Sequence, residues 1–141
     1  MTIPRIIPME FSESFNILFT VYNKHLVVEA YGKMDCYSAF IDATRRIYEK
    51  VFENNIKFLL LDFQNANLQM DWPDSFNLVR MYEKSMPVFA EVVAACTFNP
   101  ESYKFAKYWH EICQKRGFNV HLFQSRLEAE KWLSERISQS A

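Results

Sequence analysis

Three short runs that are apolar at nearly every position restrict the fold of this chain more than any other feature of its sequence. They lie at 58–61, 92–96 and 120–123, inside the stretches "KFLLLDF", "EVVAACT" and "NVHLF". A strand that is apolar at every position, and not only at every second one, is typical of a sheet covered by helices on both faces. Helical patterns separate the three runs, so the sequence predicts parallel strands joined by right-handed crossovers.

The beginning of the chain follows a different pattern. "FNILFTVY" and "HLVVEAY" are both rich in β-branched and aromatic residues, and only "NK" separates them. Strands joined by so short a turn are antiparallel. The predicted fold class is therefore α/β: a mixed sheet with an N-terminal antiparallel hairpin followed by three parallel strands, in the order β-β-α-β-α-β-α-β-α.

Capping residues, prolines and glycines set the expected ends of the helices. After Gly32, Asp35 is the expected N-cap of a helix in "CYSAFIDATRRIYEKVFEN", and a second helix covers roughly 73–86 before Pro87. A third helix begins at Asn99-Pro100 and ends near Gly117, and a capping box of Ser125 and Glu128 opens a fourth.

The length of 141 residues suits one domain with its own core. Half of the residues are hydrophobic, which favours a folded globule. We find no repeat, low-complexity tract or linker. The prediction is a single domain over 1–141, with a loose head at 1–12 and a polar tail at 138–141.

Composition also limits partners and location. The formal charge is −1, with 16 basic and 17 acidic residues spread along the chain, which argues against a nucleic-acid partner. No apolar run approaches the roughly 18 residues of a membrane span, and "MTIPRIIPMEF" does not resemble a signal peptide. Cys36, Cys96 and Cys113 are odd in number and read as reduced thiols. We therefore expect a cytoplasmic protein.

This order of elements resembles the STAS fold, and in particular its SpoIIAA-like branch. The segments that carry the resemblance are "GKMDCYSAF" before the first helix, "LLLDF" at the end of a strand, the helix entry "MDWPDSFNL", the strand "EVVAACT" and the closing "NVHLFQSRLEAEKWL". It covers about 15 to 133, and its closing stretch is the most specific part. The resemblance implies a protein that binds partners, small ligands or nucleotides.

The resemblance also implies a candidate phosphorylation site at Ser75. In the anti-sigma-factor antagonists of the family, a kinase modifies a Ser that follows an Asp where a helix begins, and Asp74-Ser75 occupies the corresponding region. A phosphate would meet unpaired backbone N–H groups there. The family's Asp-Ser-Ser-Gly context is absent, however, and Asp71 and Asp74 would repel the phosphate. The alternative is a helix start that Asp71 caps, with Asp74 at its third position.

Asp62, Asp71 and Asp74 permit further interpretations. Carboxylates of this kind can hold Mg²⁺ or Ca²⁺, but no EF-hand spacing or glycine-rich loop supports such a site. Asp62 ends a buried strand as in receiver domains, yet the acidic pair and the Lys of those domains are missing. We therefore predict capping and surface roles, with no metal and no cofactor.

The other ionisable residues form no recognisable catalytic set. His110 and Cys113 lie one helical turn apart, but zinc needs four ligands in register. Cys36 at a helix start is a nucleophile without an identifiable histidine partner. The sequence predicts no catalytic residue, and an enzyme is the weakest of the hypotheses considered.

An apolar excess surrounds the second helix. It consists of Met70, Trp72, Phe76, Leu78, Val79, Met81, Tyr82, Met86, Val88 and Phe89. These residues form either a thick core or an exposed surface that a partner covers. A ligand crevice is also expected beyond the carboxyl ends of the strands, bordered by 62–72, 97–99 and 124–125.

We therefore expect a non-enzymatic binding or regulatory module that contacts a protein partner or a second copy of itself. The alternative is a carrier of an apolar small molecule, or a reversible binder of membrane surfaces. The residues expected at the binding site are Asp62, Asp71, Trp72, Asp74, Phe76 and Met81.

Overall fold

The structure is a computed structural model that describes residues 3–140. Its centre is a six-stranded sheet in which the strands lie side by side in the order of the sequence. The strands are β1 (Arg5–Ser12), β2 (Phe15–Val21), β3 (His25–Met34), β4 (Phe58–Leu68), β5 (Val93–Phe98) and β6 (Asn119–Phe123). β2 runs antiparallel to its neighbours β1 and β3, and β3 to β6 run parallel. The predicted α/β class with a mixed sheet is confirmed, and the observed order is β-β-β-α-β-α-β-α-β-α.

The additional strand, β1, corrects the expectation of a loose head at 1–12. Residues 5–12 pair along β2, from Arg5 opposite Val21 to Ser12 opposite Phe15. Ile7, Met9 and Phe11 alternate with more exposed residues and pack against the core. The prolines at 4 and 8 suggested a loop, but an edge strand tolerates proline because half of its backbone N–H groups have no partner strand. Met1 and Thr2 lie outside the described residues.

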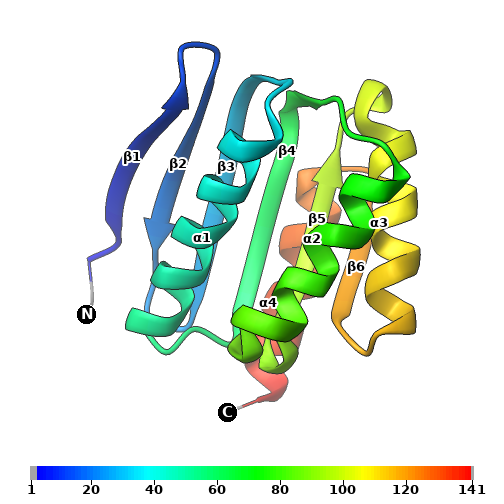
Figure 1. The fold of residues 1–141 in the computed structure, drawn as a ribbon. Coiled ribbons are helices and arrows are strands. Elements are labelled where there is room, and N and C mark those ends of the chain that lie inside the picture. The colour runs from blue at the N-terminus through cyan, green and yellow to red at the C-terminus, as the bar shows by residue number, and fades with distance from the viewer. Residues whose placement is uncertain (1–2, 141) are drawn as a thin grey trace.

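The helices cover the two faces of the sheet unequally (Figure 1). The α-helices are α1 (Tyr37–Glu53), α2 (Trp72–Ser85), α3 (Tyr103–Lys115) and α4 (Arg126–Gln139). Two short 3₁₀ helices, η1 (Pro87–Glu91) and η2 (Pro100–Ser102), lie between them. In Figure 1, α1, α2 and α3 lie in front of the sheet and α4 lies behind it. The parallel strands are therefore covered on both sides, as the apolar runs predicted.

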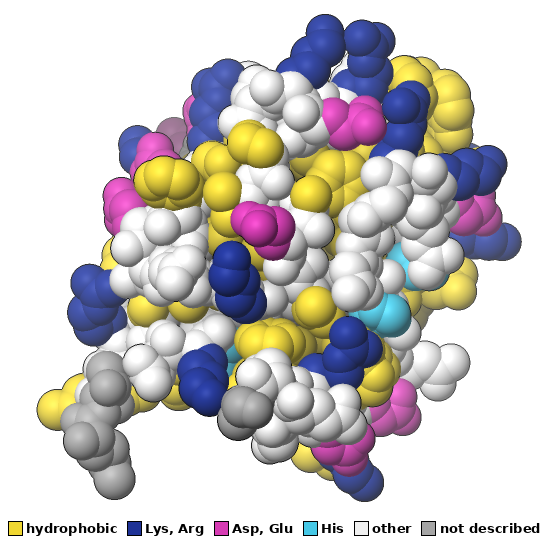
Figure 2. Space-filling view, turned by 90° about the horizontal axis from the view of Figure 1, so that it is seen from below, with side chains coloured by type: hydrophobic (Ala, Val, Ile, Leu, Met, Phe, Trp, Pro, Cys, Tyr) yellow, Lys and Arg dark blue, Asp and Glu magenta, His cyan; other side chains and the backbone are white. Residues whose placement is uncertain are grey.

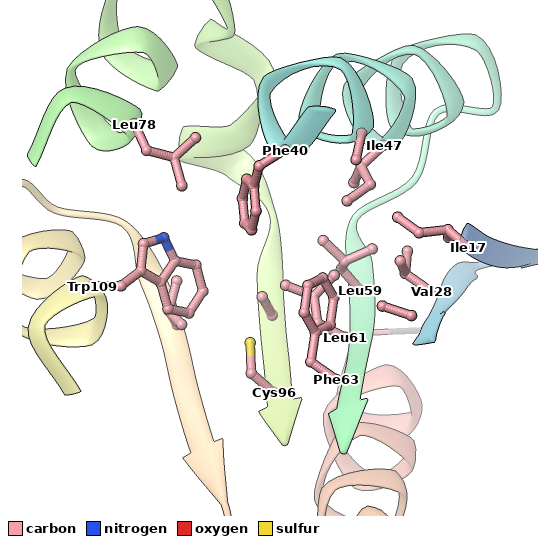
Figure 3. Close-up of a cluster of buried hydrophobic side chains, with 14 of the residues drawn as sticks. Ile17, Val28, Phe40, Ile47, Leu59, Leu61, Phe63, Leu78, Cys96 and Trp109 are labelled. Atoms are coloured by element: carbon pink, nitrogen blue, oxygen red, sulfur yellow. The ribbon is translucent and has the colours of Figure 1, made fainter. Parts of the chain in front are cut away.

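The main core fills the space between the sheet and the three front helices. Phe40 and Ile47 of α1, and Leu78 of α2, point toward Leu59 and Leu61 of β4 (Figure 3). Burial of each such side chain contributes about 1.5–3 kcal/mol. Behind the sheet, a smaller cluster joins α4 to the middle strands and consists of Val27, Leu60, Ala95, Ala129 and Leu133.

Two strands continue further than the sequence suggested. The stretch after Asp62 was expected to be a loop, but β4 runs on to Leu68 and pairs with the end of β3 at Met34. Gly32, expected to end a strand, lies within β3. The amide-rich stretch "QNAN" is therefore part of the sheet, and the turn into α2 begins only after Leu68.

Most predicted helix ends are confirmed, with two corrections. Asn99 and Ser125 cap the helices that follow them. Asp35 is not a cap: Cys36 occupies the N-cap position of α1, and no side-chain hydrogen bond caps this helix. The expected polar tail at 138–141 is partly helical, since α4 extends to Gln139; Ala141 lies outside the described residues.

Candidate functional site

The start of α2 is held by a reciprocal capping box. The Asp71 carboxylate accepts a hydrogen bond from the Asp74 backbone N–H at 3.1 Å, and the Asp74 carboxylate faces the Asp71 N–H at 3.5 Å. Burial and the adjacent charge of Asp71 raise the pKa of Asp74. The predicted capping role of these two residues is confirmed, so both carboxylates serve the local structure.

Ser75 lies beneath this capping box. Its side chain is 0% exposed, and its hydroxyl donates a hydrogen bond to the Asp71 carbonyl oxygen at 3.1 Å. A kinase would reach this hydroxyl only after the first turn of α2 had opened. Phosphorylation of Ser75 stays a prediction.

A cluster of aromatic and arginine side chains lies on the outer side of α2, and we call Trp72, Phe76, Arg80 and Arg116 the Trp72 surface. Trp72 is 50% exposed and its ring stacks on that of Phe76, with centroids 5.5 Å apart and an interplanar angle of 13°. The guanidinium carbons of Arg80 and Arg116 lie 6.0 and 5.7 Å from the centre of the Phe76 ring. Aromatic stacking and cation–π attraction therefore hold these four side chains in one arrangement.

Most of the apolar excess around α2 belongs to the core. Leu78, Val79, Tyr82 and Met86 are buried. Half-buried side chains that pack against the core are Met70, Phe76, Met81, Val88 and Phe89. Of the residues expected at the binding site, Met81 therefore faces the core more than the solvent, whereas Asp71 and Trp72 are exposed.

Asp62 lies apart from the α2 capping box, in an ionic cluster on the back of the sheet. It is 7% exposed and accepts a hydrogen bond from the Thr97 hydroxyl at 3.0 Å and one from Arg126 at 3.2 Å. Arg126, in the first turn of α4, also contacts Glu29 and Glu130. Burial alone would lower the pKa of Arg126, but these two carboxylates raise it overall.

The sequence did not predict this cluster, since Asp62 was expected to lie near Asp71 and Asp74. The cluster joins β3, β4 and α4, which lie far apart in sequence. Within residues 3–140, the structure brings together no group of three or more Asp, Glu, His or Cys side chains suited to a metal ion. Asp62 thus anchors the start of α4 to the sheet.

An open groove lies beyond the carboxyl ends of β5 and β6, next to Gln64 in the middle of β4. Its volume is about 780 Å³, and its lining includes Gln64, Asn99 and Gln124. Exposed apolar side chains also gather at this end of the molecule, since Trp72, Tyr103 and Leu127 lie in the first turns of α2, α3 and α4. At the opposite end, Figure 2 shows Lys and Arg side chains spread around the face with Asp and Glu between them. The groove overlaps the expected crevice at Gln64, Phe98, Asn99 and Gln124, but Asp62, Asp71 and Trp72 do not line it.

A second, smaller space lies among the side chains of the main core. This cavity of about 70 Å³ is almost entirely apolar, and its walls include Phe40, Leu61, Trp109 and Phe118. Among its lining side chains, the Trp109 indole N–H donates a hydrogen bond to the Tyr82 hydroxyl at 3.2 Å. Burial raises the pKa of Tyr82.

The thiols divide into one exposed and two buried groups, and all three are free. The exposed Cys36 lies 3.1 Å from the Ser38 hydroxyl, and this hydrogen bond together with nearby backbone N–H groups lowers its pKa. Burial raises the pKa of Cys96 and of Cys113, which keeps both thiols protonated. His110 lies on α3, and its ring nitrogen is 3.2 Å from the Val120 carbonyl oxygen, a structural contact with β6.

No helix among residues 3–140 combines the length and the apolar character needed to cross a bilayer. A scan against protein-family models finds no match to this chain, and a search of curated proteins finds none. The comparisons therefore assign no family, and the classification rests on the α/β fold with its mixed six-stranded sheet.

Proposed function

We propose that this protein is a non-enzymatic binding module of the STAS type that acts through contact with a protein partner. The observation that carries the proposal is the Trp72 surface. Trp and Arg are the residue types most enriched among the side chains that dominate binding energy at protein interfaces. Here the half-exposed Trp72 ring stacks on Phe76. The Phe76 ring in turn lies within cation–π distance of Arg80 and Arg116.

This prior arrangement favours binding. A partner that orders a mobile side chain loses about 0.5–1.5 kcal/mol of binding energy for each one, and the stacked Trp72 ring avoids part of that cost. Arg80 makes no ion pair within the described residues, whereas Arg116 lies 3.5 Å from Glu83. The partner we expect presents an apolar side chain to Trp72 and a carboxylate to Arg80.

Site-specific photocrosslinking in cells tests this proposal. Trp72 is replaced by p-benzoylphenylalanine, and the matched control carries the same group in place of Phe52, an exposed aromatic residue near the end of α1. We expect a covalent adduct with one defined protein from position 72 and none from position 52, and we expect Arg80→Glu to weaken the adduct. An adduct with a second copy of the chain would identify self-association. Equal adducts from both positions, or none from either, would contradict the proposal.

A second candidate function, a carrier of a small apolar molecule, is favoured by the cavity in the core. Its lining is apolar, and the Tyr82 hydroxyl is its one buried phenol. An apolar cavity of about 150 Å³ is known to hold benzene. The present cavity of about 70 Å³ is smaller, so a carrier of larger molecules would have to separate α2 or α3 from the sheet.

Native mass spectrometry distinguishes this candidate from the first. A carrier purified under mild conditions should show a mass adduct that is lost in Ala94→Val, because Ala94 lines the cavity and the added methyl groups occupy it. Flotation with phosphatidylcholine vesicles tests the related function of membrane-surface binding. Absence of both an adduct and flotation would reject the second candidate and leave the first untouched.

A further inference from the structure

The connections that leave β5 and β6 turn to opposite faces of the sheet. β5 leads through η2 into α3 in front, whereas β6 leads into α4 behind (Figure 1). In open α/β sheets, ligands bind beyond the carboxyl ends of the parallel strands. The groove of about 780 Å³ lies at this point, and its size is in the range of small-molecule sites. We call it the β5–β6 groove.

Its lining combines aromatic rings with amides. The lining residues are Gln64, Phe98, Asn99, Pro100, Tyr103, Ala106, Leu122, Phe123 and Gln124. This set contains no Asp, Glu, Lys, Arg or His, so a charged ligand would find no opposite charge among the described residues of the groove. Tyr103 is 59% exposed and offers a ring to stack against.

The floor of the groove is fixed by Asn99. Its amide group donates to the Ala66 carbonyl oxygen at 2.9 Å and to the Asn67 side-chain oxygen at 2.8 Å, and its own oxygen accepts from the Ser102 N–H at 2.9 Å. Asn99 is therefore committed to the framework. Gln64 contacts the Gln124 carbonyl oxygen only at 3.5 Å, which leaves its side-chain amide available for a stronger hydrogen bond.

We propose that the β5–β6 groove binds a small, neutral, planar molecule that carries an amide or a similar pair of hydrogen-bonding groups. The ring would lie against Tyr103 and Phe123, and the amide would pair with the side chains of Gln64 and Gln124. No residue of the Trp72 surface lines this groove, so the inference stands independently of the proposed function.

Three probes of one shape and different charge test the inference: benzamide, which is neutral, benzoate, which is an anion, and benzylamine, which is a cation. Each is titrated into the full chain by ligand-observed NMR. For a fragment of this size we expect benzamide to bind with a dissociation constant of about 1 mM. Both charged probes should bind roughly tenfold more weakly, because the groove would desolvate their charge without pairing it.

Matched variants locate the binding. Tyr103→Ala should weaken benzamide binding about fivefold through loss of the stacked ring, and Phe52→Ala, which removes an exposed ring elsewhere, should leave it unchanged. Gln124→Leu should remove the preference for benzamide over benzoate. Tighter binding of benzoate would indicate an anion site at the start of α3 and overturn the inference. Equal binding of all three probes, insensitivity to Tyr103→Ala, or no benzamide binding at 20 mM would overturn it as well.

Discussion

Gly32 occupies a backbone conformation that side chains make difficult. Its φ is +100°, and a Cβ atom built there would lie 1.7 Å from the Ser14 carbonyl oxygen. That carbonyl cannot easily move, because it accepts a hydrogen bond from the Lys33 backbone N–H at 2.9 Å. The Ser14 hydroxyl in turn donates a hydrogen bond to the Lys33 carbonyl oxygen at 3.2 Å. The close approach of β3 to the β1–β2 turn therefore requires a residue without a side chain.

We predict that Gly32→Ala lowers the free energy of unfolding by about 3 kcal/mol or more, from strain and overlap together. Gly117→Ala is the matched control. Gly117 also has a positive φ, of +85°, but a Cβ there would meet no atom within 4 Å. Its loss should be only about 1 kcal/mol. Urea unfolding measures both, and equal losses would show that the contact with Ser14 has no energetic weight.

Arg126 holds three carboxylates from three separate elements, and we predict that Arg126→Met destabilises the protein by about 2 kcal/mol. Its removal leaves the buried Asp62 carboxylate with Thr97 as its remaining side-chain partner. An unpaired buried charge is costly, although the partial exposure of Arg126 reduces the effect. Arg46→Met, which removes an exposed pair with Glu49 on α1, should cost less than about 0.5 kcal/mol. Similar losses in the two variants, measured by thermal unfolding, would be inconsistent with an anchoring role for Arg126.

At the scale of the elements, features decided by neighbouring residues were predicted correctly. The caps at Asp71, Asn99 and Ser125 depend on residues three positions apart, and the structure has all three. β1 was missed because its prolines resemble a loop until its pairing with β2 is known. The end of β4 was missed because its polar residues are held by β3 and by Asn99, which lie far away in sequence.

The candidate sites also combine features set by neighbouring residues with features set by residues far apart in sequence. The exposure of Trp72 was expected from the apolar excess of α2, but Phe76 meets Arg116 only because α2 packs against α3. The Arg126 cluster joins three elements and has no local pattern. The approximate position of the groove was predictable from the strand order, whereas the place of Gln64 in its lining depended on how far β4 extends.

The capping box of α2 can be tested at this scale. Asp71→Ala should cost about 1 kcal/mol of stability, because the Asp74 N–H loses its acceptor. Asp42→Ala, which removes an exposed carboxylate from the middle of α1, should change stability by less than about 0.5 kcal/mol. If Asp71→Ala proved as mild as Asp42→Ala in chemical denaturation, the cap would not be what holds the start of α2.

For the whole molecule, two histidines connect stability to pH. Burial lowers the pKa of His25, and the nearby Glu130 opposes this effect only in part; burial, followed by the charge of Arg136, lowers the pKa of His121. The unfolded chain therefore binds protons near pH 6.5 more readily than the folded one. Stability should be fully present above this pH and should fall as the pH drops through 6.5 toward the lower folded values.

We expect this loss to be less than about 1 kcal/mol between pH 7.5 and 5.5, since both rings are only partly buried. The double variant His25→Gln with His121→Gln should show a smaller slope over the same range. Denaturant titrations at a series of pH values measure both proteins. If the stability of the double variant changed with pH as much as that of the unaltered protein, the two histidines would not be the cause of the pH dependence.

The central claim is that this module binds its protein partner through the Trp72 surface. The most direct measurement is the affinity of the partner identified by crosslinking for three purified proteins: the unaltered chain, Trp72→Ala and Phe52→Ala, compared by calorimetry. We predict that Trp72→Ala weakens binding by about thirtyfold, the loss typical of a dominant interface residue, and that Phe52→Ala changes it by less than about twofold. Equal affinities of the unaltered chain and Trp72→Ala would contradict the claim.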